Sequence, residues 1–189
     1  MNDEQLIRLS LEGDQGAFGV LVTKYKVKVF NLAYSLTHNR ETADDLTQEV
    51  FLKAYMSLSS FKFKSGFGTW LYRITVNHAH DFLRKEKKVK TVPFLDERKN
   101  EQTETDPLDR RVQADIARER QLLVRRTLRS LPEKHRTILT LRDIQGISYE
   151  EIAKILRIAP GTVDSRLHRA RKLLHTRMAP SFSPHGGDT

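Results

Sequence analysis

Apolar residues recur at three- and four-residue steps through most of the chain, which is the spacing of one face of an α-helix. A helix is predicted over residues 15–37, where Ala17, Leu21, Tyr25 and Val29 follow this spacing. We find no run with the strict alternation and β-branched enrichment that are typical of a strand. The pattern therefore predicts an all-α protein.

A second helix is predicted from Arg40 to about Leu58, with Asn39 in the capping position before it. Its apolar face repeats at three- and four-residue steps through Ala43, Leu46, Val50 and Ala54. The opposite face is polar and mostly charged, and we call it the acidic stripe. It comprises Asp44, Asp45, Gln48, Glu49 and Lys53.

Residues 59–68 (SSFKFKSGFG) break this pattern, and a further helix is predicted from Thr69 to about Lys88. Loop and helix together resemble platforms that stack unpaired bases on aromatic rings and hold the backbone with cations. Residue type alone favours core packing for Trp70. We name this set the loop-and-helix surface: Lys62, Lys64, Phe67, Trp70, Arg73, Asn77, Arg84 and Lys85, with Phe63 and His80 beside them.

The strongest local pattern is a pair of helices after residue 147. Ser148 and Glu151 have the spacing of a capping box that opens a helix over Tyr149–Leu156. A tight turn leads to Pro160, which suits the first turn of a helix running to Leu174. The apolar stripe of that helix, Val163, Leu167, Ala170 and Leu174, would face the core.

Two helices joined in this way predict a helix-turn-helix whose second helix enters a major groove. The exposed face of that helix is the basic stripe: Thr162, Ser165, Arg166, His168, Arg169, Arg171 and Lys172. The alternative is an ordinary helical hairpin with a solvated basic face. The coincidence of cap, turn, apolar stripe and basic stripe favours DNA reading.

The remaining pattern divides the chain into two small helical domains. Residues 93–115 lack apolar periodicity and contain two prolines, which is typical of a flexible linker. We therefore predict domains over residues 1–92 and 116–179, followed by a disordered tail over 180–189. Within the second domain, helices are predicted from about Arg118 to Ser130 and from Glu133 to about Ile144.

Charge adds to this picture because it is unevenly placed. The 189 residues carry a net charge of +9. Residues 61–92 hold eight basic and two acidic residues. Residues 93–119 hold five basic and eight acidic residues, and residues 120–159 hold nine basic and four acidic ones. Two basic regions flank an acidic linker, which suggests two contacts with one polyanion. Solubility alone is the alternative explanation.

Composition excludes several kinds of chemistry. The chain has no cysteine, which excludes disulfides and thiolate metal sites and suits a reducing cytoplasm. It shows neither a signal peptide nor an apolar stretch of the ~20 residues that cross a bilayer. His78 and His80 do not form a metal-ligand set, and Asp45 and Glu49 lack a phosphate-binding loop beside them. We expect a cytoplasmic protein that is not an enzyme and needs no cofactor or metal.

Three motifs now carry a resemblance: DDLTQEVFLKAY (44–55), FGTWLYRITVN (67–77) and the stretch from Leu131 to Leu174. In this order and at these separations they resemble the extracytoplasmic-function (ECF) sigma factors of bacterial RNA polymerase. The resemblance covers nearly everything except the linker and the tail. It implies an N-terminal domain that binds the polymerase clamp and opens the −10 element. It also implies a C-terminal domain that reads the −35 element and docks on the polymerase flap.

Residue by residue, the resemblance implies that the acidic stripe binds core polymerase, the loop-and-helix surface opens the −10 strand and the basic stripe reads the −35 element. The acids suit a protein partner, because carboxylates repel phosphate. The expected partners are core polymerase, promoter DNA and an anti-sigma factor. The alternative from another class is a stand-alone helix-turn-helix regulator with an N-terminal interaction domain, which would leave residues 44–84 without a role.

Overall fold

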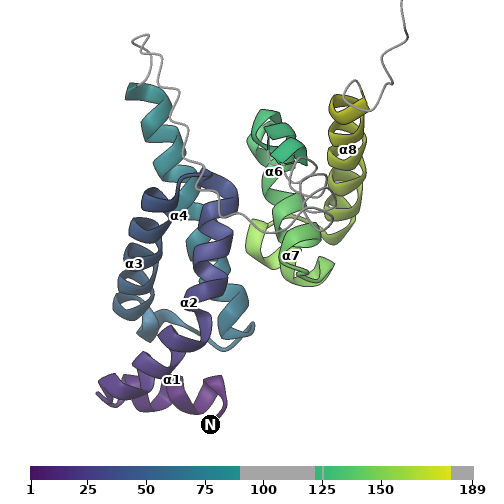
Figure 1. The fold of residues 1–189 in the computed structure, drawn as a ribbon. Coiled ribbons are helices and arrows are strands. Elements are labelled where there is room, and N and C mark those ends of the chain that lie inside the picture. Colours follow the sequence, from purple (N-terminus) through teal and green to yellow (C-terminus); the bar gives the residue numbers. More distant parts are fainter. Residues whose placement is uncertain (90–121, 125, 180–189) are drawn as a thin grey trace, which may run out of the picture.

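The computed structural model describes residues 1–89, 122–124 and 126–179, and every regular element in these ranges is helical (Figure 1). The predicted all-α class is confirmed. The predicted linker 93–115, the predicted tail 180–189 and the start of the helix expected from Arg118 lie outside the described residues.

The N-terminal half holds α1 (Asp3–Leu11), α2 (Gln15–Thr37), α3 (Arg40–Met56), the 3-10 turn η1 (Leu58–Ser60) and α4 (Phe67–Val89). The prediction for α2 is confirmed at both ends, and α4 begins two residues before the predicted start. Asn39 caps α3 as predicted, because its side chain accepts a hydrogen bond from the Thr42 amide. His38 turns the chain between α2 and α3 in a left-handed conformation, with φ of 57°.

Helix α1 is an element that the apolar pattern did not predict. Asn2 and Gln5 form a capping box at its start, and Leu6 and Ile7 are buried. Its nine residues are too few for a clear period, and a helix of this length depends on packing for its stability. The Asp3 carboxylate supplies part of that packing, because it bonds Lys24 Nζ and the Tyr25 hydroxyl, each at 2.5 Å.

The C-terminal half contains helical residues at 122–124 and 126–130, then α6 (Glu133–Leu139), η2 (Thr140–Ile144), α7 (Tyr149–Leu156) and α8 (Pro160–Met178). The predicted capping box is confirmed, with Ser148 Oγ 3.2 Å from the Glu151 amide. The helix predicted from Glu133 to Ile144 differs in one respect, because its last turn widens into a π-helix at Thr140. Gly146, with φ of 69°, ends it.

Two clusters of buried apolar side chains hold the molecule together. The first lies within the N-terminal half, where Leu21, Val29 and Leu71 are among the most buried side chains. Tight packing there involves Gly68, where an added Cβ would approach the Tyr25 ring to 3.0 Å. This cluster fixes η1 and the start of α4 against α1 and α2.

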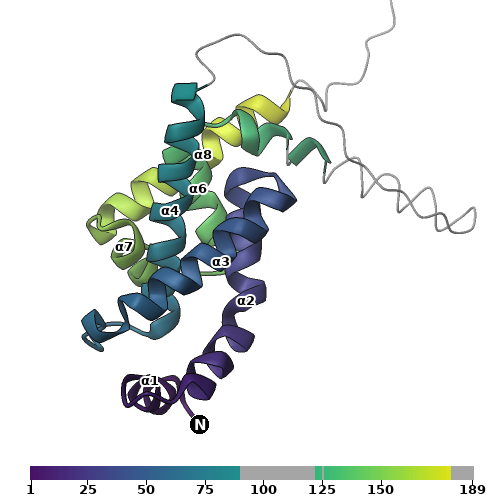
Figure 2. The ribbon, with the colours of Figure 1, turned by 90° about the vertical axis from the view of Figure 1, so that its left-hand side faces the viewer.

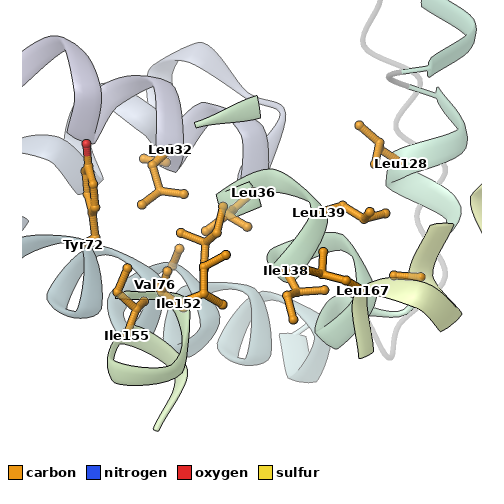
Figure 3. Close-up of a cluster of buried hydrophobic side chains, with 14 of the residues drawn as sticks. Leu32, Leu36, Tyr72, Val76, Leu128, Ile138, Leu139, Ile152, Ile155 and Leu167 are labelled. Atoms are coloured by element: carbon orange, nitrogen blue, oxygen red, sulfur yellow. The ribbon is translucent and has the colours of Figure 1, made fainter. Parts of the chain in front are cut away.

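The second cluster crosses between the two halves. Leu32 and Leu36 of α2 and Val76 of α4 belong to the same cluster as Ile152 and Ile155 of α7 (Figure 3). Helix α4 packs against α7 of the C-terminal half, and the two lie side by side in Figure 2. The apolar pattern along the sequence predicts which residues are buried, but it does not reveal that the halves share a core.

No helix within the described ranges is long and apolar enough to cross a membrane.

Candidate nucleic-acid interface

The acidic stripe is exposed along α3, and the apolar residues of the other face are buried. The exposed face also contains apolar side chains that the sequence analysis did not single out. Leu52 is 60% exposed, Met56 75% and Tyr55 42%. Because Asp45, Leu52 and Met56 are separated by seven and four residues, they lie along one side of the helix. The outer face of α3 is therefore acidic near its start and apolar near its end.

His78 of α4 connects two members of the acidic stripe. Its Nδ1 lies 2.7 Å from Lys53 Nζ, and its Nε2 lies 2.5 Å from Glu49 Oε2. Lysine can only donate, so Nδ1 accepts and Nε2–H donates to the carboxylate. This arrangement orders Glu49 and Lys53 on the outer face of α3. Sequence spacing could not reveal it, since His78 is on another helix.

Two aromatic residues of the loop-and-helix surface are buried. Phe67 is 2% and Trp70 7% exposed, and their ring centroids lie 5.6 Å apart. Phe61 packs against both, at 6.0 Å and 5.2 Å. In this conformation these rings hold the loop against the helices rather than offering a face to a base. The preference of Trp70 for core packing agrees with its burial.

Phe63 is the aromatic residue of this loop that faces solvent. Its side chain is 41% exposed, between the exposed Lys62 and Lys64. Its φ of 55° is a left-handed conformation that costs a non-glycine residue roughly 1–2 kcal/mol. The ring packs on Phe61 at 4.9 Å, and the Arg8 guanidinium lies 5.3 Å from its centre. The loop thus presents one ring among three cations.

The rest of the loop-and-helix surface follows α4. Asn77, Arg84 and Lys85 are exposed, and Arg84 pairs with Asp81 at 2.9 Å. Arg73 is half-buried, and burial, followed by the nearby charge of Arg157, lowers its pKa. Arg157 is in the turn of the helix-turn-helix, so Arg73 lies beside the C-terminal half.

The basic stripe lies on α8 as predicted, opposite a buried face. Val163, Leu167 and Ala170 are fully buried. Ser165, His168, Arg169, Arg171 and Lys172 are exposed, and Thr162 and Arg166 are half-buried. The basic stripe is therefore accessible to solvent along most of its length.

Arg171 differs from its neighbours because it already has a partner. Its Nη2 and Nε donate to the two carboxylate oxygens of Asp143, at 2.6 Å and 3.2 Å. This bidentate pair raises the pKa of Arg171 and ties α8 to the π turn η2. Arg171 thus has a positioning role that spacing along α8 could not reveal.

The first turn of α6 brings further basic groups to the stripe. Lys134 is exposed. Burial lowers the pKa of His135, and so do the positive charges of Lys134, Arg166 and Arg169 around it. The sequence analysis did not select Lys134 or His135, because nothing in the sequence states which helix lies beside α8.

Within the described ranges, no group of three or more His, Asp or Glu side chains is placed to hold a metal ion.

Two stretches of the chain match known protein families. Residues 21–89 match the family described as sigma-70 region 2, and residues 121–174 match sigma-70 region 4. The first range contains the acidic stripe and the loop-and-helix surface through Lys85. The second contains the basic stripe.

Individual sigma factors are similar to this chain over nearly its whole length. The RNA polymerase sigma-H factor of Pseudomonas aeruginosa is 36% identical over 94% of each chain. The ECF RNA polymerase sigma-E factor of Escherichia coli K12 is also 36% identical, over 95% of this chain and 96% of its own.

Solved structures also resemble this chain over most of its length. CnrH in complex with the cytosolic domain of CnrY superposes with a TM-score of 0.69 at 27% identity, covering 96% of this chain and 99% of its own. The sigma factor RpoE of Bartonella quintana, in complex with the anti-sigma factor NepR, superposes with a TM-score of 0.66 at 25% identity, covering 86% and 96%. With both sigma-70 regions in order and relatives matched along almost their full length, the chain belongs to the ECF sigma factors of bacterial RNA polymerase.

Proposed function

We propose that this alternative sigma factor divides its work among three surfaces: the outer face of α3 binds core polymerase, the loop-and-helix surface opens the −10 element, and the basic stripe reads the −35 element. The observation that supports this division best is that each of the three surfaces has exposed polar or charged side chains on a different helix, with the chemistry its partner requires. A stand-alone regulator is not favoured, since it would leave α3 and the loop without a role.

The proposed polymerase contact combines charge with apolar area. Asp45 and Glu49 can steer a basic partner, whereas Leu52 and Met56 can be buried against it. The ordering of Glu49 and Lys53 by His78 lowers the entropy lost when the two surfaces meet.

For promoter DNA, the loop supplies a base-stacking ring in Phe63 and phosphate contacts in Lys62 and Lys64. Phe67 and Trp70 support that loop from beneath. On α8, Arg166 and Arg169 read base edges, while Lys172 contacts phosphate and Arg171 also positions α8 through Asp143.

The same proposal includes the setting in which the protein works. It contributes recognition and strand opening rather than catalysis, and it acts in the cytoplasm, where polymerase and promoter meet. The solved structures of CnrH and RpoE contain the cytosolic domain of CnrY and the anti-sigma factor NepR. We propose by analogy that an anti-sigma factor also regulates this chain.

The test reverses the charge of the acidic stripe. Asp45→Lys combined with Glu49→Lys should abolish binding to core polymerase, and with it promoter-dependent transcription. Both residues are exposed, and the change also removes the hydrogen bond from His78 Nε2 to Glu49, so the free energy of unfolding should fall by only about 1 kcal/mol. Affinity is measured with labelled sigma factor and purified core enzyme.

The matched control is Glu12→Lys combined with Glu150→Lys, which makes the same charge change at exposed positions away from α3. It should bind core polymerase like the unmodified chain. Equal affinities for the two double variants would refute the proposed polymerase surface.

A further inference from the structure

We propose that α1 belongs to the surface that holds the opened −10 strand, and that Arg8 contacts the phosphate of the nucleotide whose base stacks on Phe63. This inference rests on the proposed function and adds to it a residue from outside the loop-and-helix surface. The stretch that matches sigma-70 region 2 begins at residue 21, so α1 lies before it.

Helix α1 brings Arg8 to the loop. The loop between α3 and α4 lies near α1 at the lower end of the molecule in Figure 1, where α1 contacts η1. The Arg8 guanidinium lies over the Phe63 ring, 5.3 Å from its centroid. At this distance a guanidinium is attracted to the face of an aromatic ring. Arg8 is therefore a neighbour of the ring that is proposed to receive a base.

Burial fixes the position of α1. Leu6 and Ile7 are 2% and 1% exposed, and they belong to the apolar cluster that also contains Phe61 of the loop. The side chain of Arg8, the next residue, is instead 63% exposed. A helix held in place by its apolar face thus presents an accessible cation beside an accessible ring.

The chemistry of this place suits a phosphate. A strand that stacks a base on Phe63 carries its phosphates past the surrounding cations, which are Arg8, Lys62 and Lys64. Among these three only Arg8 has a planar guanidinium, which can donate two parallel hydrogen bonds to one phosphate.

Glu4 is the partner of Arg8 in the free chain. Its Oε1 accepts a hydrogen bond from Arg8 Nη2 at 2.7 Å, across one turn of α1. Both side chains are more than half exposed, so the pair contributes little to stability. The Glu4 carboxylate would repel an incoming phosphate and would compete with it for the guanidinium.

This geometry predicts opposite effects for two substitutions one turn apart. Arg8→Gln removes the cation that contacts the strand and should weaken binding. Glu4→Gln removes the competing carboxylate and should strengthen binding. If Arg8 only fastened the loop to α1, the loss of its partner would weaken binding or leave it unchanged.

The first test uses holoenzyme reconstituted from purified core polymerase and the full chain. The probe is a labelled promoter fragment that is duplex at the −35 element and single-stranded at the −10 element. Arg8→Gln should weaken binding roughly threefold to tenfold and reduce the slope of log affinity against log salt concentration by about 0.7, the contribution of one single-strand phosphate. Glu4→Gln should bind about twofold more tightly. Arg8→Lys keeps the charge and should keep the slope.

Arg40→Gln is the matched control. Arg40 is exposed, and its guanidinium lies 6.0 Å from the centroid of the Phe30 ring where α2 meets α3. The substitution makes the same change in charge and breaks the same kind of ring contact at another place. It should leave the salt slope unchanged.

A second test locates the phosphate. Methylphosphonate linkages replace the phosphates of the −10 strand by neutral groups, one at a time. At one linkage the replacement should weaken binding by the unmodified holoenzyme and by Arg40→Gln, yet have no further effect on Arg8→Gln. If every linkage weakens Arg8→Gln as much as the unmodified chain, Arg8 contacts no phosphate and the inference is overturned.

The failure of this inference can be told from the failure of the proposed function. If Phe63→Ala impairs promoter opening but Arg8→Gln leaves the salt slope unchanged, the loop opens the strand and only the role of α1 is wrong. If the unmodified holoenzyme does not prefer the −10 strand to a strand of unrelated sequence, both are wrong.

Discussion

At the scale of single residues, burial separates side chains that the sequence places in one group. Phe63, Phe67 and Trp70 all come from one short aromatic stretch, and composition cannot say which ring faces solvent. Phe63 touches the cluster that holds the other two only through Phe61 and stays 41% exposed, at a position where the backbone is left-handed. Local strain of this kind is more common at functional sites than elsewhere.

We predict that Phe63→Ala and Phe67→Ala fail in different ways. Phe63→Ala should slow promoter opening by about 5- to 150-fold, since a stacked base contributes ~1–3 kcal/mol. It should change the free energy of unfolding by less than about 1 kcal/mol. Phe67→Ala should instead cost ~3–5 kcal/mol of stability, because it empties a buried site. Opening is followed with a fluorescent base in the −10 element, and stability by urea unfolding.

A template whose −10 region is already mismatched supplies the control for Phe63. The defect of Phe63→Ala should shrink on that template. An equal defect on closed and mismatched templates would count against a role for Phe63 in opening.

At the scale of elements, the sequence predicts long amphipathic helices well and short, packed ones poorly. Caps and apolar period identify α2, α3, α7 and the start of α8 to within two residues. The helix α1 escapes detection because its stability comes from contacts with α2. The π turn η2 also escapes, because apolar period and caps do not distinguish it from a continued α-helix. The same limit explains why Lys134 and His135 were not assigned to the basic stripe.

We predict that Asp3→Ala loosens α1. The Asp3 carboxylate bonds Lys24 and Tyr25 and is half-buried, so its loss should cost about 1–2 kcal/mol in the free energy of unfolding. The neighbouring Glu4→Ala removes an exposed pair with Arg8 and should cost less than about 0.5 kcal/mol. Urea unfolding of the two variants gives both values.

This contribution should also depend on pH. Burial alone would raise the pKa of Asp3, but its hydrogen bonds from Lys24 and Tyr25 outweigh burial and hold the pKa below its ordinary value of 3.8. The stabilisation is therefore complete above that value and is lost as the pH falls further. If Asp3→Ala and Glu4→Ala destabilise the chain equally at neutral pH, the carboxylate does not hold α1 in place.

At the scale of the whole molecule, the shared core is the feature that sequence reading cannot supply. The predicted division at residues 93–115 rests on composition and stays a prediction, because those residues lie outside the described ranges. The apolar stripes of α4 and α7 each suggest burial, but not burial against each other. Which stripes meet depends on how the helices fit together in three dimensions, and periodicity carries no such information.

We predict that replacing a buried valine by alanine affects the C-terminal half at one position of the N-terminal helices but not at another. Val76→Ala and Val29→Ala each remove a fully buried side chain, at a cost of roughly 1–3 kcal/mol. Val76 belongs to the shared cluster and Val29 to the N-terminal one. Only Val76→Ala should therefore speed amide hydrogen exchange in α7. The measurement is exchange followed by mass spectrometry of peptides from the C-terminal half, and equal exchange in both variants would show that the halves are not coupled.

The core that α2, α4 and α7 share has a consequence for how the chain loses its structure. Because part of each half is buried only against the other half, the two should unfold together in one cooperative transition rather than in two separate steps. A substitution in this shared cluster therefore lowers the stability of both halves, including surfaces that the substituted residue does not touch.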